Sequence, residues 1–188
     1  GPVPLTVLTG DQSAAPFAFG PLDPATAYVN LGTGAFVQRA VPGALPEAPR
    51  LLVSVVWSTA THVDYLLEGT VNGAASALDW LAARDGVALP ELLAAAERAA
   101  EAGETSPLFI NGVSGLGAPF WVSDLESRFI GTGGPGARTL AVLESIAFLV
   151  QANLAELAPH GPPLRRLLVT GGLSGNAYLR RCLAALAG

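Results

Sequence analysis

Three short turns in this sequence carry the residue types that a phosphate-handling site requires. The triplet Gly-Asp-Gln at 10–12 follows an apolar run, and the triplet Gly-Thr-Gly at 32–34 follows a second one. A third apolar run at 167–169 leads through a threonine into a Gly-Gly pair at 171–172. Together the turns supply one carboxylate, one hydroxyl between glycines and one glycine pair ahead of a helix. This set indicates a phosphate site built from backbone amides and one acid.

Asp11 is the candidate acid-base group. A carboxylate at the C-terminal end of a buried strand loses hydration, which raises its pKa and suits it to act as a general base toward a hydroxyl. In phosphoryl transfer such a residue orients the attacking hydroxyl and accepts its proton. Gln12 beside it can bond a further substrate hydroxyl. An aspartate that caps the turn after the strand is the alternative, and the local sequence taken alone favours it.

The turn Gly32-Thr33-Gly34 is the candidate phosphate loop. Its glycines allow backbone amides to approach an anion closely, and Thr33 adds a hydroxyl donor for a β- or γ-phosphate oxygen. The alternative is an ordinary hairpin turn, which the triplet by itself favours.

The pair Gly171-Gly172 precedes a helix, with Ser174 as the candidate N-cap. A helix N-terminus behind a glycine turn suits a nucleotide phosphate or purine. Asn176, in the first turn, is placed to bond a base or ribose. A generic strand-to-helix turn remains the alternative.

The elements that must position these turns follow from hydrophobic periodicity and from glycine and proline stops. The helix at 137–158 is apolar on nearly all sides and is therefore expected in the core, and Gly86 is expected to end the first helix. The long glycine-rich stretch at 112–136 is expected to be functional or to contain short strands. Strands are expected at 5–10, 27–31, 35–40, 51–57, 62–68, 108–110 and 167–169, and helices at 71–83, 90–102, 137–158 and 175–186. This order predicts an α/β domain with a mixed sheet.

Composition restricts the class of protein. The 188 residues suffice for one good-sized domain, and 51% are hydrophobic. Only 13% are charged, so either a partner domain or subunit covers part of the surface, or the chain is simply rich in small residues. The net charge of −5 and scattered basic residues argue against nucleic-acid binding. The lone Cys182 excludes an internal disulfide and favours the cytoplasm.

Several other sites and segments are not expected. The N-terminus shows no signal-peptide pattern, and Glu144 and Ser145 interrupt the apolar run at 140–150, so no membrane span is expected. Neither a Walker A lysine loop nor a dinucleotide fingerprint is present. His62 and His160 lie far apart, which argues against zinc. The spacing of His62 and Asp64 is better explained by alternation along a strand than by a catalytic pair.

Taken together, these motifs resemble the C-terminal, nucleotide-binding domain of the FGGY carbohydrate kinases, which include glycerol kinase, xylulokinase and gluconate kinase. The resemblance runs through essentially the whole chain, and its landmarks occur in the family's order with compatible spacing. They are the segments at 10–12, 32–34, 68–69 (Glu-Gly), 78–81 (Leu-Asp-Trp-Leu), 115–121 (Gly-Leu-Gly-Ala-Pro-Phe-Trp), 143–148 (Leu-Glu-Ser-Ile-Ala-Phe), and 171–172 with Asn176.

The resemblance implies the actin-like, ribonuclease-H-like ATPase fold, a mixed sheet flanked by helices. In that family two such domains face each other across a cleft that closes on sugar and ATP. The catalytic base falls on Asp11, the neighbouring polyol contact on Gln12, and the hydroxyl that contacts the nucleotide phosphates on Thr33.

The resemblance also carries nucleotide contacts onto Gly172 and Asn176. In glycerol kinase, the helix after the Glu-Gly pair supplies a glycine and a glutamine to the nucleotide site. Those positions are Ala75 and Asp79 in this sequence, as in many ketose kinases. The segment at 115–121 is expected to be scaffold near the nucleotide cleft.

The implied function is ATP-dependent phosphorylation of a sugar or polyol hydroxyl, with this chain as the C-terminal domain at residues 1–188. ATP or ADP is the implied cofactor with Mg²⁺, the metal lying near Asp11. The family's N-terminal domain, which holds most of the sugar pocket, is the implied partner, and the family continues beyond Gly188 with a strand and a helix. The isolated domain is expected to be inactive, and a second copy is a candidate partner. Acetate-kinase-like or heat-shock-chaperone-like ATPases and a non-catalytic nucleotide- or partner-binding module remain alternatives.

Overall fold

The computed structural model describes residues 10–187, apart from the side chains of Asp11 and Gln12. The strand expected at 5–10 therefore lies outside the described residues, except for Gly10. Asp11 is the first residue of a short helix, α1 (Asp11–Ala14), which continues into a 3-10 turn, η1 (Ala15–Phe19).

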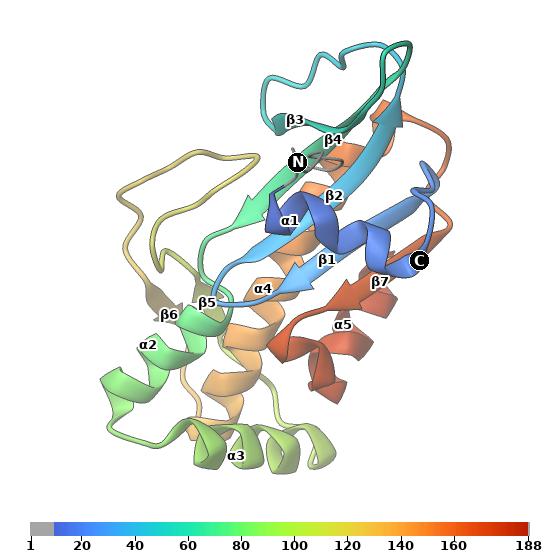
Figure 1. Cartoon of the computed structure of the whole chain (residues 1–188). Coiled ribbons are helices and arrows are strands. Elements are labelled where there is room, and N and C mark those ends of the chain that lie inside the picture. Colours follow the sequence, from blue (N-terminus) through green and yellow to red (C-terminus); the bar gives the residue numbers. More distant parts are fainter. Residues whose placement is uncertain (1–9, 188) are drawn as a thin grey trace, which may run out of the picture.

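Among the described residues, five strands form a mixed sheet at the centre of the molecule, in the order β3-β4-β2-β1-β7 (Figure 1). β1 runs parallel to β7 and antiparallel to β2, and the pairs β2–β4 and β3–β4 are antiparallel. The pairing of Leu31 with Ala35 confirms the hairpin expected around residues 32–34. The strands are β1 (Thr26–Leu31), β2 (Ala35–Pro42), β3 (Leu52–Ser58), β4 (Val63–Val71) and β7 (Arg166–Thr170).

The boundary between β4 and the next helix was wrong in the sequence prediction. Val71 pairs with Ala35 and closes the β4 ladder, whereas the periodicity had indicated a helix from Val71. The helix begins only at Ala75. The reason is tertiary, because pairing with β2 extends the strand by three residues beyond the predicted end at Glu68.

The helices expected from periodicity are otherwise confirmed. Gly86 ends α2 in the left-handed region, with φ of 64°, as its position had indicated. The glycine-rich stretch at 112–136 contains β6, which pairs with β5, and an isolated bridge between Leu116 and Val122. The remaining elements are α2 (Ala75–Asp85), α3 (Leu89–Glu101), β5 (Leu108–Ile110), β6 (Arg128–Ile130), α4 (Pro135–Leu157), η2 (Ala158–His160), η3 (Gly172–Gly175) and α5 (Ala177–Ala187).

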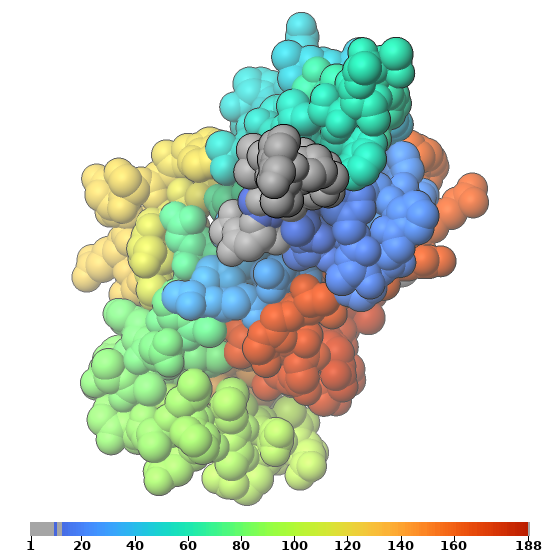
Figure 2. Space-filling model, in the orientation of Figure 1, coloured from blue at the N-terminus to red at the C-terminus, as the bar shows by residue number. Residues whose placement is uncertain are grey.

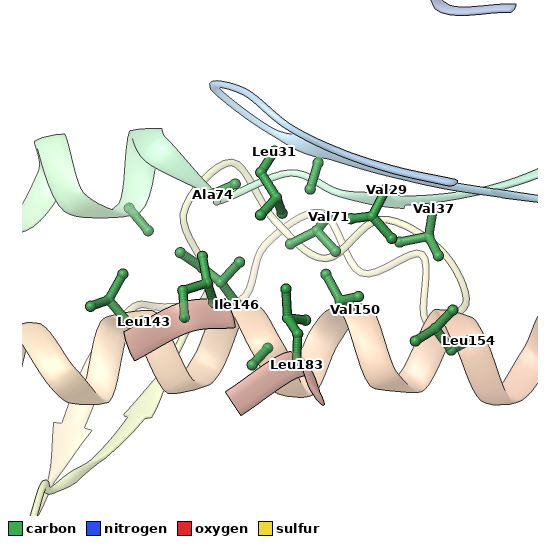
Figure 3. Packing of buried hydrophobic residues seen from close by; sticks show 14 of the residues in the cluster. Val29, Leu31, Val37, Val71, Ala74, Leu143, Ile146, Val150, Leu154 and Leu183 are labelled. Atoms are coloured by element: carbon green, nitrogen blue, oxygen red, sulfur yellow. The ribbon is translucent and has the colours of Figure 1, made fainter. Parts of the chain in front are cut away.

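The core lies between one face of the sheet and the long helix α4. In Figure 3, Ile146, Val150 and Leu154 of α4 project toward Val29 and Val37 of the sheet. The helical run Pro135–His160 has a mean hydropathy of 1.5 over its most apolar window and is long enough to cross a membrane. Glu144 and Ser145 therefore do not interrupt the apolar run, contrary to the expectation from the sequence. However, 61% of that window is buried inside the protein. It is therefore the core helix that the sequence predicted.

A buried arginine fastens the C-terminal end of α4 to the sheet. Arg39 of β2 is fully buried and donates to the carbonyls of Leu157 and Ala158 at 3.0 and 2.9 Å, as well as to those of Pro24 and Pro162. Burial lowers the pKa of this guanidinium. The Leu157 and Ala158 carbonyls are at the negative end of α4, so they stabilise the cation.

Candidate functional site

Two glycine turns, the first at residues 32–34 and the second at residues 171–172, lie side by side at one edge of the sheet. β1 and β7 run parallel, with Asn30 opposite Thr170, so both strands deliver their following turns to the same edge. Gly171 packs so closely on β1 that a Cβ there would lie 2.4 Å from the Leu31 carbonyl oxygen. Figure 2 shows the light-blue end of the β1–β2 hairpin at the surface, between the green segment of α2 and the orange-red segment of β7 and α5.

Hydrogen bonds from the start of α2 fix the carbonyls of the first turn. The Thr33 carbonyl accepts hydrogen bonds from the amides of Ala74 and Ser76 at 3.1 and 3.0 Å, and from the Ser76 hydroxyl at 3.0 Å. The Gly32 carbonyl accepts from the Ala75 amide at 3.0 Å. The turn is thereby fixed by groups more than forty residues away along the chain.

This arrangement directs two amides of the turn away from α2. In a trans peptide the N–H points opposite to the C=O, so the Thr33 and Gly34 amides point away from the helix that binds the Gly32 and Thr33 carbonyls. Neither amide donates a hydrogen bond to any other residue in the described part of the chain. Thr33 itself is exposed. Two outward-facing amides beside a hydroxyl are donors of the kind that bind anions.

Ala75 and Asp79 lie on the first two turns of α2. Ala75 is beside the phosphate-loop candidate because its amide bonds Gly32. Asp79 is exposed and lies one helical turn farther along. The first amides of α2 are thus occupied by protein carbonyls and are not available to an anion.

The second turn is closed by its own backbone. The Gly171 carbonyl accepts from the Ser174 amide at 3.0 Å, and the Leu173 carbonyl accepts from the Asn176 amide at 3.0 Å. The N-cap of α5 is Asn176, whose Oδ1 accepts from the Leu179 amide at 2.9 Å. The expectation that Ser174 caps this helix was wrong, because η3 inserts a 3-10 turn before α5 begins at Ala177.

A hollow lies next to Asn176, at the start of α5. It has a volume of about 280 Å³ and is bounded by α3, α4 and α5. Its walls include Glu97, Leu143, Tyr178 and Arg181. With Oδ1 engaged as the cap, the Nδ2 of Asn176 has no hydrogen-bond partner among the described residues and is available to a ligand.

The face of the sheet opposite α4 carries a polar pair between β2 and β4. Gln38 Nε2 donates to Glu68 Oε2 at 2.6 Å, and the two residues are opposite each other in register. Burial raises the pKa of Glu68, and the bond from Gln38 partly opposes that shift. Asp11 and Gln12 belong to the backbone of α1, and their side chains lie outside the described residues.

His62 and Asp64 form a pair away from the two turns. His62 Nε2 lies 2.8 Å from Asp64 Oδ1, but the pair is at the start of β4, whereas the two turns lie beyond the end of that strand. Among residues 10–187 no group of three or more His, Cys, Asp or Glu side chains gathers as a metal site would require.

Sequence reasoning missed the role of residues 74–76 in holding the phosphate-loop candidate, since alanine amides carry no sequence signal.

The comparisons agree with this architecture. Residues 27–188 match the C-terminal domain of the FGGY family of carbohydrate kinases. The chain belongs to this family. Glycerol kinase from Synechocystis sp. is 34% identical over 99% of the chain, and glycerol kinase from Bordetella parapertussis is 37% identical over all of it. The chain spans 40% and 39% of the length of these relatives.

Solved structures show the same fold. Plasmodium falciparum glycerol kinase with ADP superposes with a TM-score of 0.81 at 24% identity, covering 93% of this chain and 36% of that one. Xylulose kinase from Rhodospirillum rubrum gives a TM-score of 0.73 at 24% identity, with the same coverage. The mixed sheet flanked by helices is therefore the actin-like ATPase fold, as the sequence motifs had indicated.

Proposed function

We propose that this chain is the nucleotide-binding half of an ATP-dependent kinase that phosphorylates a sugar or polyol hydroxyl. The observation that carries the proposal is the pair of outward-facing amides of Thr33 and Gly34 beside the second glycine turn. The chain belongs to the FGGY family, and the amides of Thr33 and Gly34 are donors that suit a polyphosphate. Positioning and electrostatic stabilisation account for most of the rate in phosphoryl transfer.

The described residues fit a nucleoside di- or triphosphate. The amides of Thr33 and Gly34 and the Thr33 hydroxyl receive its phosphates, with Gly32 shaping the turn. Gly171 shapes the second turn, Gly172 leaves open space for the nucleoside, and Asn176 Nδ2 supplies a donor next to the hollow between α3, α4 and α5. Ala75 and Asp79 lie beside this path on α2. Mg²⁺ would enter with ATP and would supply positive charge to the phosphates, with Asp11 as the residue proposed to lie near it.

Asp11 is the proposed general base and Gln12 the proposed contact to the acceptor. Asp11 orients the attacking hydroxyl and takes its proton, so that the hydroxyl oxygen bonds to the terminal phosphorus while the bond from that phosphorus to the bridging oxygen breaks and ADP leaves. An N-terminal domain of the same protein supplies the rest of the acceptor pocket. We place the enzyme in the cytoplasm, with a second copy of the chain as a candidate partner.

The test is sugar-stimulated ADP release by the full-length protein, measured over a panel of polyols and ketoses. Asp11→Asn is expected to lower turnover roughly 10²- to 10⁴-fold while Mg-ADP binding, followed by calorimetry, stays near the wild-type value. Asp64→Asn, at the opposite end of β4, is the matched control and keeps its turnover. Near-normal turnover in Asp11→Asn contradicts the base assignment. Mg-ADP binding without turnover on any acceptor favours the non-catalytic module instead.

A further inference from the structure

The peptide group that joins Gly73 to Ala74 is held at both ends. Its carbonyl accepts a hydrogen bond from Asn111 Nδ2 at 2.8 Å, and its N–H donates to the Thr33 carbonyl at 3.1 Å. Asn111 thus lies one peptide group away from the phosphate-loop candidate, although it contacts no residue of that turn by a hydrogen bond.

Asn111 is built into the core rather than placed at the surface. Only 5% of it is exposed, and it follows directly after β5. Its Nδ2 also donates to Ser145 Oγ of α4 at 3.1 Å, and Ser145 in turn donates to the Val142 carbonyl. A Cβ on Gly73 would lie 2.5 Å from Asn111 Oδ1, so the glycine allows this close approach. The side-chain amide of Asn111 is therefore anchored to α4, the buried core helix.

The bonds form a chain of peptide groups that ends at the anion site. Asn111 donates to the carbonyl of the Gly73–Ala74 peptide, and the N–H of that peptide donates to the Thr33 carbonyl. The Thr33 carbonyl belongs to the Thr33–Gly34 peptide, whose N–H is the outward-pointing amide of Gly34. Hydrogen bonds in such a chain polarise one another, and each makes the next donor stronger. Asn111 therefore affects both the orientation and the donor strength of the Gly34 amide.

We propose that Asn111 is a positioning residue for phosphate binding: it orients the Gly34 amide toward the nucleotide phosphates through the Gly73–Ala74 peptide. This assignment rests on the proposed function, because it requires a phosphate at that amide. Asn111 itself contacts no ligand in this proposal, and it lies far from residues 32–34 in the sequence.

The test compares a ligand with phosphates and one without. In the full-length protein, Asn111→Leu is expected to weaken Mg-ADP binding roughly tenfold, while adenosine binding, measured by competition, stays unchanged. A merely structural role would weaken both ligands together. Gly73→Ala places a Cβ against Asn111 Oδ1, which pushes the Asn111 side chain away from the Gly73 carbonyl without removing the Asn111 amide. It is expected to give the same selective loss, and it stands in if Asn111→Leu does not fold.

Asn153→Leu is the matched control. Asn153 is also fully buried and donates Nδ2 to a backbone carbonyl, that of Leu149 at 2.9 Å, but this bond is internal to α4. It is expected to lower stability without changing the ratio of the two affinities. Equal loss of both ligands in Asn111→Leu, or no loss of either, overturns the assignment. If the wild-type protein binds no Mg-ADP, the proposed function fails as well, which is a separate result.

Discussion

The two glycine turns at the sheet edge obtain their shape in different ways. The turn at 32–34 is held by α2, an element forty residues farther along, which binds two of its carbonyls. The turn at 171–175 is closed by its own backbone bonds and by close packing against β1. The hydrogen bonds that hold the first turn therefore come largely from a distant element, whereas those of the second turn come from within the turn.

The difference extends to individual glycines. Gly171 has a φ of 89° and would collide with the Leu31 carbonyl if it carried a Cβ, whereas a Cβ on Gly172 meets nothing within 4 Å. The adjacent glycines thus separate two roles. Gly171 is required by the fold, and Gly172 leaves open space where a ligand is proposed to lie.

The largest effect is expected from Gly171→Ala. Positive φ is unfavourable for alanine, and the new Cβ would lie 2.4 Å from the Leu31 oxygen, so β1 and β7 must separate locally. We expect a loss of about 3 kcal/mol in the free energy of unfolding, measured by urea denaturation of the full-length protein.

Gly172→Ala sharpens that comparison. With no neighbour near its Cβ, the substitution is expected to change stability by less than about 0.5 kcal/mol but to weaken Mg-ADP binding. If both alanine variants unfold at the same urea concentration, the two glycines do not have separate roles.

Asn176 combines both roles in one side chain, and two substitutions separate them. Asn176→Ala removes the α5 cap and is expected to cost about 1 kcal/mol of stability together with nucleotide affinity. Asn176→Asp keeps an acceptor for the Leu179 amide but loses Nδ2, so stability is expected to hold while Mg-ADP binding weakens. Unchanged Mg-ADP affinity in Asn176→Asp would leave the residue with the capping role alone.

Much of the fold was predictable because its signals are local. The long apolar run of α4, the stop at Gly86 and the hairpin around 32–34 all follow from short stretches of sequence. The end of β4 was not predictable, because it depends on pairing with β2. The cap of α5 was assigned to Ser174 since a 3-10 turn before a helix leaves no distinctive pattern.

The site was predictable only in part for the same physical reason. Glycines and a threonine mark the turns, so Thr33 and Gly172 could be chosen from the sequence. The groups that fix the first turn are backbone amides of residues 74–76 and a buried asparagine beyond β5. Backbone amides are the same for every residue except proline, and no spacing rule links Asn111 to Gly34. Such contacts become visible only when the chain is folded.

The smallest effect is expected from Ser76→Ala, which tests whether the first turn is held by backbone or by side chain. The Ser76 hydroxyl adds one bond to the Thr33 carbonyl, while three amides from residues 74–76 already hold the turn. Removing the hydroxyl is therefore expected to cost about 0.5 kcal/mol of stability and to leave Mg-ADP affinity close to wild type. A loss of affinity as large as that expected for Asn111→Leu would show that the hydroxyl, and not the peptide chain behind it, orients the turn. The small effect is thus informative, because it assigns the geometry of this turn to the backbone of α2.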